Sequence, residues 1–288
     1  MGVKIRTIKE IRSSLSVELN GLYPEQEINT LASIIIRTLP QAEKLHRIYD
    51  PGHILDDESI RRVTKIITEL KQGRPIQYIL GRSEFYNCIL RVTEATLIPR
   101  QETEELVDLI IRENRGFTGN ILDIGTGSGC IAISLAKNIP ASSVTGTDIS
   151  HDALVIAQAN ARLNNAKVEF LEEDIFNPGR LLTGRQDIIV SNPPYVLLSE
   201  KVLMHRNVLE HEPHEALFVN DSEPLLFYKT ILFIAEKILQ PGGKVYFEIN
   251  EAMGKEMIRL FETYKYSDIS LFKDINGKDR IIRGILNG

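Results

Sequence analysis

The chain has no tryptophan and only two cysteines among its 288 residues. Two cysteines cannot build a disulfide framework, and no Cys/His cluster has the spacing of a zinc site, so we expect no metal. No apolar run approaches the roughly 18 residues that a membrane span needs. The N-terminus also lacks the charged-then-apolar pattern of a secretion signal. Together these absences predict a cytoplasmic protein with no membrane partner. The length of 288 residues predicts one large domain plus a small one.

An excess of positive charge is also missing. The formal net charge is -5. Residues 1–75 contain twelve Lys or Arg against ten Asp or Glu, which leaves +2, so the rest of the chain carries −7. Proteins that grip a nucleic-acid backbone usually display a basic patch or stripe. Neither part of this chain has the average charge of such a surface.

A rigid polar tetrapeptide follows an apolar run. The run Ile188–Ser191 is typical of a buried parallel strand, and directly after it come Asn192, Pro193, Pro194 and Tyr195. Open α/β sheets bind ligands at the carboxyl edge of such strands. Because the prolines lack backbone donors, the turn offers carbonyl oxygens beside the Asn192 amide and the Tyr195 ring. This predicts a pocket for a planar –NH2 group, from a Gln or Asn amide or from a base; a plain Pro-rich turn is the alternative.

A glycine-rich turn lies upstream, between a strand pattern at Asn120–Ile124 and a helix pattern at Ile131–Lys137. The turn consists of Gly125, Thr126, Gly127, Ser128 and Gly129. Glycines let the backbone approach a ligand, and a helix N-terminus offers free N–H groups, so the pattern predicts a nucleotide-binding unit. The dinucleotide fingerprint would need glycine where Cys130 stands, which weakens an assignment to NAD without excluding it.

An acidic residue ends the next predicted strand. Asp148 follows the apolar stretch Val144–Thr147, about 20 positions beyond the glycines, where an acidic residue typically binds a ribose hydroxyl pair. The alternative role is the N-cap of the next helix. Ser150 and Asp152 are also available for that cap, so we predict the ribose role for Asp148.

Another acidic residue, Asp174, follows a third predicted strand at Lys167–Leu171. Its carboxylate could accept from an adenine amino group while Ile175 and Phe176 pack on the ring. A solvated acidic turn is the alternative.

Apolar periodicity divides the chain. Stretches before Gly73 space apolar residues three and four apart, which predicts a bundle of four or five helices over residues 1–75. Asp56 should cap the last of these helices and Gly73 should end it. Alternation over Phe85–Val92 predicts a β-hairpin linker within residues 76–100.

The large domain is expected over residues 101–288, with an opening helix near 101–114. A later helix is predicted at about 222–239, and Pro241–Gly243 should then lead into a strand at Lys244–Ile249. No low-complexity segment or internal repeat interrupts this pattern.

The C-terminal stretch and a long loop complete the domain. Ile269–Ile275 and Arg280–Ile285 flank Asn276-Gly277, a pair that suits a tight primed hairpin turn. Residues 196–221 lack periodicity and follow a predicted ligand-binding strand end. They are therefore a candidate substrate-covering loop, with a plain surface loop as the alternative.

Taken in order, these motifs resemble those of class I S-adenosylmethionine-dependent methyltransferases, and the Asn-Pro-Pro-Tyr form is shared by enzymes that methylate planar –NH2 nitrogens. Other segments resemble one branch, the release-factor glutamine methyltransferases of the PrmC/HemK family. These segments are Gly73–Gly81, Ile98–Arg100, Thr103-Glu104, Glu212-Pro213, Ala216-Leu217, Asp274, Gly277 and Arg280. The resemblance covers the chain from about residue 70 to its end.

The resemblance implies a doubly wound, mostly parallel, seven-stranded, Rossmann-like sheet, preceded by a helical bundle that docks the substrate. It implies S-adenosylmethionine as methyl donor, S-adenosylhomocysteine as product, and no metal. The implied partners are peptide chain release factors, methylated on the side-chain amide nitrogen of the glutamine in their GGQ motif. No nucleic-acid substrate is expected.

The resemblance also implies roles for individual residues. Those implied to bind the cofactor are Asp123, Gly125, Thr126, Gly127, Ser128, Gly129, Asp148, Asp174, Ile175 and Asn192. Those implied to be catalytic are Asn192, Pro193 and Tyr195. Those implied to bind the substrate are Asn192, Pro193, Pro194, Tyr195, Glu212 and Pro213.

The chain departs from the family pattern at three places. Gln101 stands where a proline is common, and Asn250–Gly254 replaces a segment that usually contains Gly and later Gln. Ile175 stands where an aromatic residue is frequent. We therefore expect no cofactor contact from Asn250–Gly254 and a weaker adenine contact at position 175.

The expected mechanism follows from the poor nucleophilicity of an amide nitrogen, whose lone pair is delocalised. The Asn192 side-chain oxygen and the Pro193 backbone oxygen would each accept one N–H, which orients the nitrogen, while Tyr195 packs against the amide plane. Two other functions stay open: a nucleic-acid amino methyltransferase and a non-catalytic S-adenosylmethionine-binding scaffold. The lack of basic enrichment counts against the first, and the intact tetrapeptide counts against the second.

Overall fold

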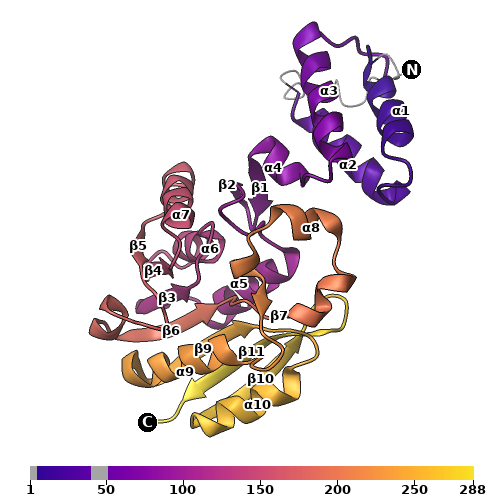
Figure 1. Cartoon of the computed structure of the whole chain (residues 1–288). Coiled ribbons are helices and arrows are strands. Elements are labelled where there is room, and N and C mark those ends of the chain that lie inside the picture. The colour runs from indigo at the N-terminus through magenta and orange to yellow at the C-terminus, as the bar shows by residue number, and fades with distance from the viewer. Residues whose placement is uncertain (1–4, 40–50) are drawn as a thin grey trace. The chain divides into compact units, whose positions relative to one another are not determined.

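The computed structural model describes residues 5–39 and 51–288, which fall into two compact units (Figure 1). One unit contains the described residues up to Leu80 together with Arg206–His211. The other contains Gly81–His205 and Glu212–Gly288.

The first unit is helical in its described part. Its helices are α1 (Ile8–Glu18), α2 (Glu25–Arg37), α3 (Asp57–Lys71), α4 (Ile76–Leu80) and α8 (Arg206–His211). Leucine and isoleucine side chains from α1, α2 and α3 form a separate apolar core. The prediction of four or five helices covers residues 1–75, of which 1–4 and 40–50 lie outside the described residues. The described part of this range contains α1, α2 and α3.

Local signals set the helix ends in this unit. α1 starts at a capping box, in which Thr7 and Glu10 each accept from the other's backbone N–H. The Asp56 side chain accepts from Ser59 N–H at 2.7 Å and caps α3. Gly73 follows α3 with φ +80, a left-handed conformation that glycine adopts at helix ends. The predicted cap and stop of this helix are confirmed.

A β-hairpin begins the second unit. Strands β1 (Arg82–Phe85) and β2 (Cys88–Arg91) pair antiparallel. The turn residues Tyr86 and Asn87 both have positive φ, as a primed two-residue turn requires.

The hairpin is attached to helix α7 (His151–Leu163) by two asparagines. Asn160 and Asn164, one helical turn apart, each pair with both the N–H and the C=O of a β2 residue, Arg91 and Ile89 respectively. These amide pairs imitate the hydrogen bonds of a neighbouring strand.

The second unit is built on one seven-stranded sheet of order β10-β11-β9-β6-β3-β4-β5 (Figure 1). Its strands are β3 (Asn120–Ile124), β4 (Ser143–Asp148), β5 (Val168–Glu172), β6 (Gln186–Ser191), β9 (Leu239–Glu248), β10 (Tyr266–Lys273) and β11 (Asp279–Leu286). Neighbours from β9 to β5 run parallel, whereas β11 pairs antiparallel with both β9 and β10. The predicted doubly wound, mostly parallel sheet is confirmed.

Helices cover both faces of this sheet. Helices α5 (Gln101–Glu113), α6 (Cys130–Asn138) and α7 pack on one face, and α9 (Leu226–Ile238) and α10 (Gly254–Thr263) pack on the other. Alternate strand residues supply the two cores: Ile188 and Val190 belong to the first, and Ile189 between them belongs to the second. Burial on both faces of the sheet explains the apolar run Ile188–Val190 within β6.

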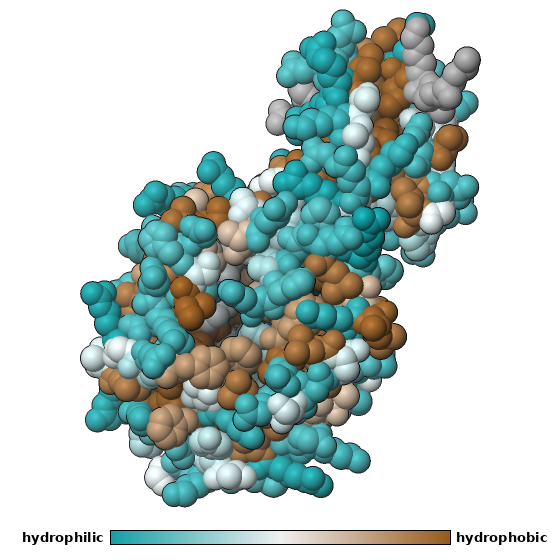
Figure 2. All heavy atoms as spheres, viewed as in Figure 1, coloured by the Kyte–Doolittle hydropathy of each residue, from teal (hydrophilic) through white to brown (hydrophobic). Residues whose placement is uncertain are grey.

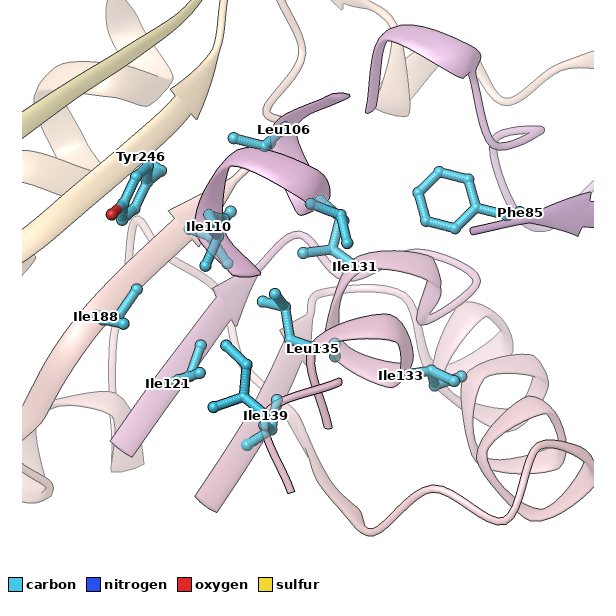
Figure 3. Packing of buried hydrophobic residues seen from close by; sticks show 14 of the residues in the cluster. Phe85, Leu106, Ile110, Ile121, Ile131, Ile133, Leu135, Ile139, Ile188 and Tyr246 are labelled. Atoms are coloured by element: carbon cyan, nitrogen blue, oxygen red, sulfur yellow. The ribbon is translucent and has the colours of Figure 1, made fainter. Parts of the chain in front are cut away.

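Figure 3 shows the first of these cores at close range. Its labelled members include Leu106 and Ile110 of α5, Ile131 and Leu135 of α6, and Ile121 and Ile188 of the sheet. These six side chains are at most 3% exposed. Burial of each stabilises the fold by about 1.5–3 kcal/mol relative to an exposed side chain, so the strand ends that carry the site rest on a rigid support.

Two boundary predictions need correction. The strand expected at Lys244–Ile249 begins earlier, at Leu239, because Pro241–Gly243 forms an irregularity in its pairing with β6 instead of a separate turn. The helix expected at 222–239 is α9. It starts at Leu226, after a turn that Asn220 and Ser222 stabilise.

The C-terminal hairpin also differs from the prediction. Its connection spans five residues, with Gly277 N–H donating to Asp274 O and Asp274 N–H donating to Lys278 O. Gly277 has positive φ but Asn276 does not. A primed turn needs positive φ at both positions, so the tight-turn prediction is wrong.

The segment 196–221 contains short elements. They are β7 (Val196–Leu197), the 3-10 helices Leu198–Leu203 and His214–Ala216, the helix α8, and β8 (Phe218–Val219), which pairs parallel with β7. The first 3-10 helix exposes Val202 by 86% and Leu203 by 82%, and apolar side chains gather over this part of the surface in Figure 2. Across the residues described, no helix has the length and apolar character needed to cross a membrane.

Candidate active site

The two main sequence motifs meet where the order of the sheet reverses. The chain runs outward from β3 to β5 on one side and from β6 toward β10 on the other. Ile124 at the end of β3 lies opposite Ser191 at the end of β6, whose hydroxyl donates to Ile124 O at 2.6 Å. Ligands of open α/β sheets bind at this switch point. The glycine-rich turn and the tetrapeptide Asn192–Tyr195 thus begin side by side at the carboxyl edge.

The three glycines of the turn differ in their surroundings: Gly129 packs against neighbouring helices, whereas Gly125 and Gly127 face open space. All have positive φ: +72 at Gly125, +54 at Gly127 and +81 at Gly129. A Cβ at Gly129 would approach Ile133 and Ala157 within 2.9 and 3.2 Å, so this glycine lets α6 pack closely on α7. A Cβ at Gly125 or Gly127 would meet nothing within 4 Å. The backbone at these two positions is therefore open to a ligand.

Asp148 at the end of β4 stabilises this turn. Its Oδ2 accepts from Gly127 N–H at 2.8 Å, and its Oδ1 accepts from Ser150 N–H at 2.9 Å. Ser150, whose hydroxyl accepts from Ala153 N–H, is the N-cap of α7, so Asp148 is not needed as that cap. Burial raises the pKa of Asp148 above its usual value. Each carboxylate oxygen has a second lone pair available for an incoming hydroxyl.

Asp123, the penultimate residue of β3, is fully buried. Its Oδ2 accepts from the Thr126 hydroxyl at 2.6 Å and from Ala132 N–H at 3.2 Å. Within the described residues, neither its Oδ1 nor the Ser128 hydroxyl has a hydrogen-bond partner. Burial raises the pKa of Asp123 to about 7. Buried polar atoms are rarely left unpaired in folded proteins, so this turn is suited to a polar ligand or water.

Asp174 lies in a local turn. Its carboxylate accepts from Phe176 N–H and from the Asn177 side chain, each at 2.8 Å. Ile175 packs partly buried against the core under α9, and Phe176 makes an edge-on ring contact with Phe227. This geometry favours the acidic-turn alternative for Asp174, and its adenine contact stays a prediction.

The tetrapeptide is connected to a buried carboxylate by hydrogen bonds (the Glu248 network, formed by Asn192, Thr103, Glu248 and Tyr195). Asn192 Nδ2 donates to Thr103 Oγ1 at 3.2 Å, and Thr103 Oγ1 donates to Glu248 Oε2 at 2.6 Å. The Tyr195 hydroxyl donates to the other oxygen, Glu248 Oε1, at 2.9 Å. Burial holds the pKa of Tyr195 well above its usual value, so the phenol stays neutral and able to donate.

Glu248 is the last residue of β9 and is 1% exposed. Burial raises its pKa, while the hydrogen bonds from Thr103 and Tyr195 act in the opposite direction. Two residues from other elements hold the backbone at this end of the strand: Tyr228 donates to Glu248 O at 3.0 Å, and Arg280 donates to Ile249 O at 3.3 Å.

Glu212 has partners that define its place in the structure. Its carboxylate is 1% exposed and accepts from Ile98 N–H at 3.1 Å and from the Arg100 guanidinium at 2.6 Å. Pro213 follows it and begins the short His214–Ala216 turn. Glu212 therefore fixes the segment that leads into α5, and its contact with substrate stays a prediction.

The sequence motifs assign no role to two residues of the Glu248 network, Thr103 and Glu248. In the sequence, Thr103 is only a match to the family pattern, and Glu248 is only part of a late strand. The sequence signal that could have found Glu248 is an ionisable residue directly after the apolar run Val245–Phe247. Such a carboxylate needs partners, and its position at a carboxyl edge places those partners near a ligand site.

Comparisons with known proteins agree with this geometry. The family model "Methyltransferase small domain" matches residues 102–215. A release factor glutamine methyltransferase of Flavobacterium psychrophilum is 45% identical over 280 residues, which cover 96% of this chain and 98% of that protein. One from Bacteroides thetaiotaomicron is 45% identical over 275 residues, covering 96% and 99% respectively.

Among solved structures, a methyltransferase from Pyrococcus furiosus has a TM-score of 0.51 at 17% identity, covering 81% of this chain and all of that one. The seven-stranded sheet and the match to the methyltransferase model over residues 102–215 define a class I methyltransferase domain. Within that class, the long matches to the bacterial relatives show that the chain belongs to the release factor glutamine methyltransferase family.

Proposed function

We propose that the protein transfers a methyl group from S-adenosylmethionine to the side-chain amide nitrogen of the glutamine in the GGQ motif of peptide chain release factors. The observation that supports this most strongly is the pairing of an open glycine turn with Asn192–Tyr195 at one switch point. The names of its relatives support the substrate.

The glycine turn fits the methyl donor. Gly125 and Gly127 leave room for close approach, and Asp148 keeps free lone pairs for ribose hydroxyls. The unpaired Asp123 Oδ1 fits a hydrogen-bond donor or a cation at the same turn. When bound there, S-adenosylmethionine supplies a methyl group activated by its positively charged sulfur. Asp174 and Ile175 are proposed to flank its adenine.

The tetrapeptide fits the acceptor amide. Asn192 Oδ1 and Pro193 O are proposed to accept one N–H each, while the Tyr195 ring packs against the amide plane and Pro194 keeps the turn rigid. Two fixed acceptors orient the nitrogen and stabilise the positive charge that develops on it, so no strong base has to act first. The proton that the nitrogen gives up passes to water.

The domain organisation suggests a division of labour, in which the helical part over residues 1–75 docks the release factor and residues 101–288 carry out the reaction. The first unit has its own apolar core and is not needed to complete the sheet. Glu212 and Pro213 are proposed to shape the substrate rim by holding the segment at Arg100.

A parallel assay tests the function. The purified protein is incubated with donor carrying a labelled methyl group and, separately, with release factor, RNA and DNA. We expect label on the release factor, on glutamine. Label on nucleic acid alone would make the protein an amino methyltransferase of bases, and label on no substrate would make it a donor-binding scaffold.

A further inference from the structure

The Glu248 network contains a carboxylate that touches neither proposed ligand directly. Glu248 ends β9 next to the end of β6, where Phe247 lies opposite Ser191. It is buried, and each of its side-chain oxygens accepts one hydroxyl, from Thr103 and from Tyr195. A buried charge without such partners would be strongly destabilising, so the two hydroxyls are committed to it.

The direction of these hydrogen bonds determines how the Asn192 amide is turned. The Glu248 carboxyl accepts from both hydroxyls, and the Thr103 hydroxyl has a single proton, which it donates to Glu248. Toward Asn192 the Thr103 oxygen can then only accept. The Asn192 atom facing it, at 3.2 Å, must be the donor Nδ2. The Oδ1 and Nδ2 atoms of an amide are bonded to the same carbon and point in different directions. With Nδ2 facing Thr103, Oδ1 is therefore turned away from it.

We propose that Glu248 is a positioning residue, which acts through Thr103 to present the oxygen of Asn192, and not its NH2, to the substrate amide. The inference rests on the proposed function. With the amide reversed, Nδ2 would face the glutamine NH2, so two donors would meet and the acceptor that orients the nitrogen would be lost. Through its second oxygen Glu248 also fixes the Tyr195 ring beside the same amide.

The test compares variants of the full-length protein in steady-state methylation of a release factor. Glu248→Gln keeps the size of the side chain but can donate as well as accept, so the direction of the network is no longer imposed. We expect kcat to fall about tenfold or more, the scale seen when an outer orienting partner is removed. The S-adenosylmethionine Kd, measured by calorimetry, should change less than about twofold.

Thr103 provides the matched variants. Thr103→Val removes the hydroxyl without changing the shape and should lower kcat as Glu248→Gln does, while Thr103→Ser should retain most of the kcat that the valine variant loses. Thr230→Val is the control for the loss of a threonine hydroxyl outside the network. It removes a hydroxyl that donates a hydrogen bond to Leu226 O within α9. Because both residues act through one network, the double variant Glu248→Gln/Thr103→Val should be little worse than either single variant.

The outcomes separate the inference from the function. A wild-type protein that labels no release factor would overturn the proposed function and with it the inference. Given an active wild type, a wild-type kcat in Glu248→Gln would overturn the inference alone. So would a loss in that variant that is matched by weaker donor binding and a lower Tm, because it would assign Glu248 a structural role.

Discussion

The two halves of the site differ in how completely their polar atoms are paired. On the tetrapeptide side, Asn192, Thr103, Tyr195 and Glu248 form a continuous set of hydrogen bonds. On the glycine-turn side, Asp123 Oδ1 and the Ser128 hydroxyl are buried without a partner in the described residues. One half is thus already oriented by hydrogen bonds within the protein, whereas the other keeps two buried polar atoms without a partner among the residues described.

The largest effect is expected in the oriented half. Asn192→Ala removes one preorganised acceptor, so turnover should fall about 100-fold or more. Affinity for S-adenosylmethionine should stay within a few-fold, because the glycine turn is unchanged. Methylation kinetics and calorimetry measure the two quantities, with Asn138→Ala on α6 as the control. Near-normal turnover in Asn192→Ala would show that this half does not orient the substrate.

The second effect concerns the unpaired carboxyl in the other half. Because the folded-state pKa of Asp123 is raised to about 7, the folded protein binds a proton there that the unfolded chain has already released. Its stabilising contribution is present at low pH and is lost as pH rises toward and through 7. Relative to Asp123→Asn, the ligand-free wild type should lose roughly 2–3 kcal/mol between pH 5 and 8.

Urea unfolding at the two pH values checks this. Equal changes in the free energy of unfolding for wild type and Asp123→Asn would show that the carboxyl is not held in a costly buried state.

A third prediction tests the open backbone of the glycine turn. Gly125→Ala should weaken donor binding about tenfold, because its methyl group enters the space left for the ligand. Gly277→Ala is a matched control, since Gly277 has a similar φ of +77 and equally open surroundings in the C-terminal hairpin. Both variants should lose about 1–2 kcal/mol of stability from the left-handed backbone. Equal donor affinities in the two variants, measured by calorimetry, would contradict a ligand site at Gly125.

The smallest effect is expected at Asp148. Asp148→Asn keeps its size but loses one acceptor oxygen, which is worth about 1 kcal/mol, or roughly fivefold in donor affinity. Turnover at saturating donor should change little. Unchanged affinity would remove the ribose assignment.

Local sequence is sufficient to predict the position of a site residue when that position depends only on one strand end and the turn after it. Apolar runs mark the strands and polar residues follow them, which predicts the positions of the glycine turn, Asp148 and the tetrapeptide. The Glu248 network could not be found in this way. It depends on β9 lying next to β6 and on the first turn of α5 placing Thr103 between Asn192 and Glu248. Both contacts join residues that are far apart in the sequence.

The two hairpin turns also show that local sequence alone does not determine the turn conformation. Asn276-Gly277 has the sequence of a primed turn but belongs to a five-residue connection, in which Asp274 also pairs with Arg280 at 3.2 Å. The primed turn is instead formed by Tyr86-Asn87. There Tyr86 N–H donates to Glu104 at 2.8 Å and the Tyr86 hydroxyl donates to Asp108 at 3.0 Å. Tertiary contacts to α5 stabilise a conformation that local preference alone would not select.

The most direct measurement is a structure of the protein with S-adenosylhomocysteine and a glutamine peptide from a release factor. It should place the glutamine amide nitrogen about 3 Å from both Asn192 Oδ1 and Pro193 O, with the sulfur of the product across the glycine turn. An Asn192 side chain turned away from that sulfur, with no space between them for an amide, would contradict the account.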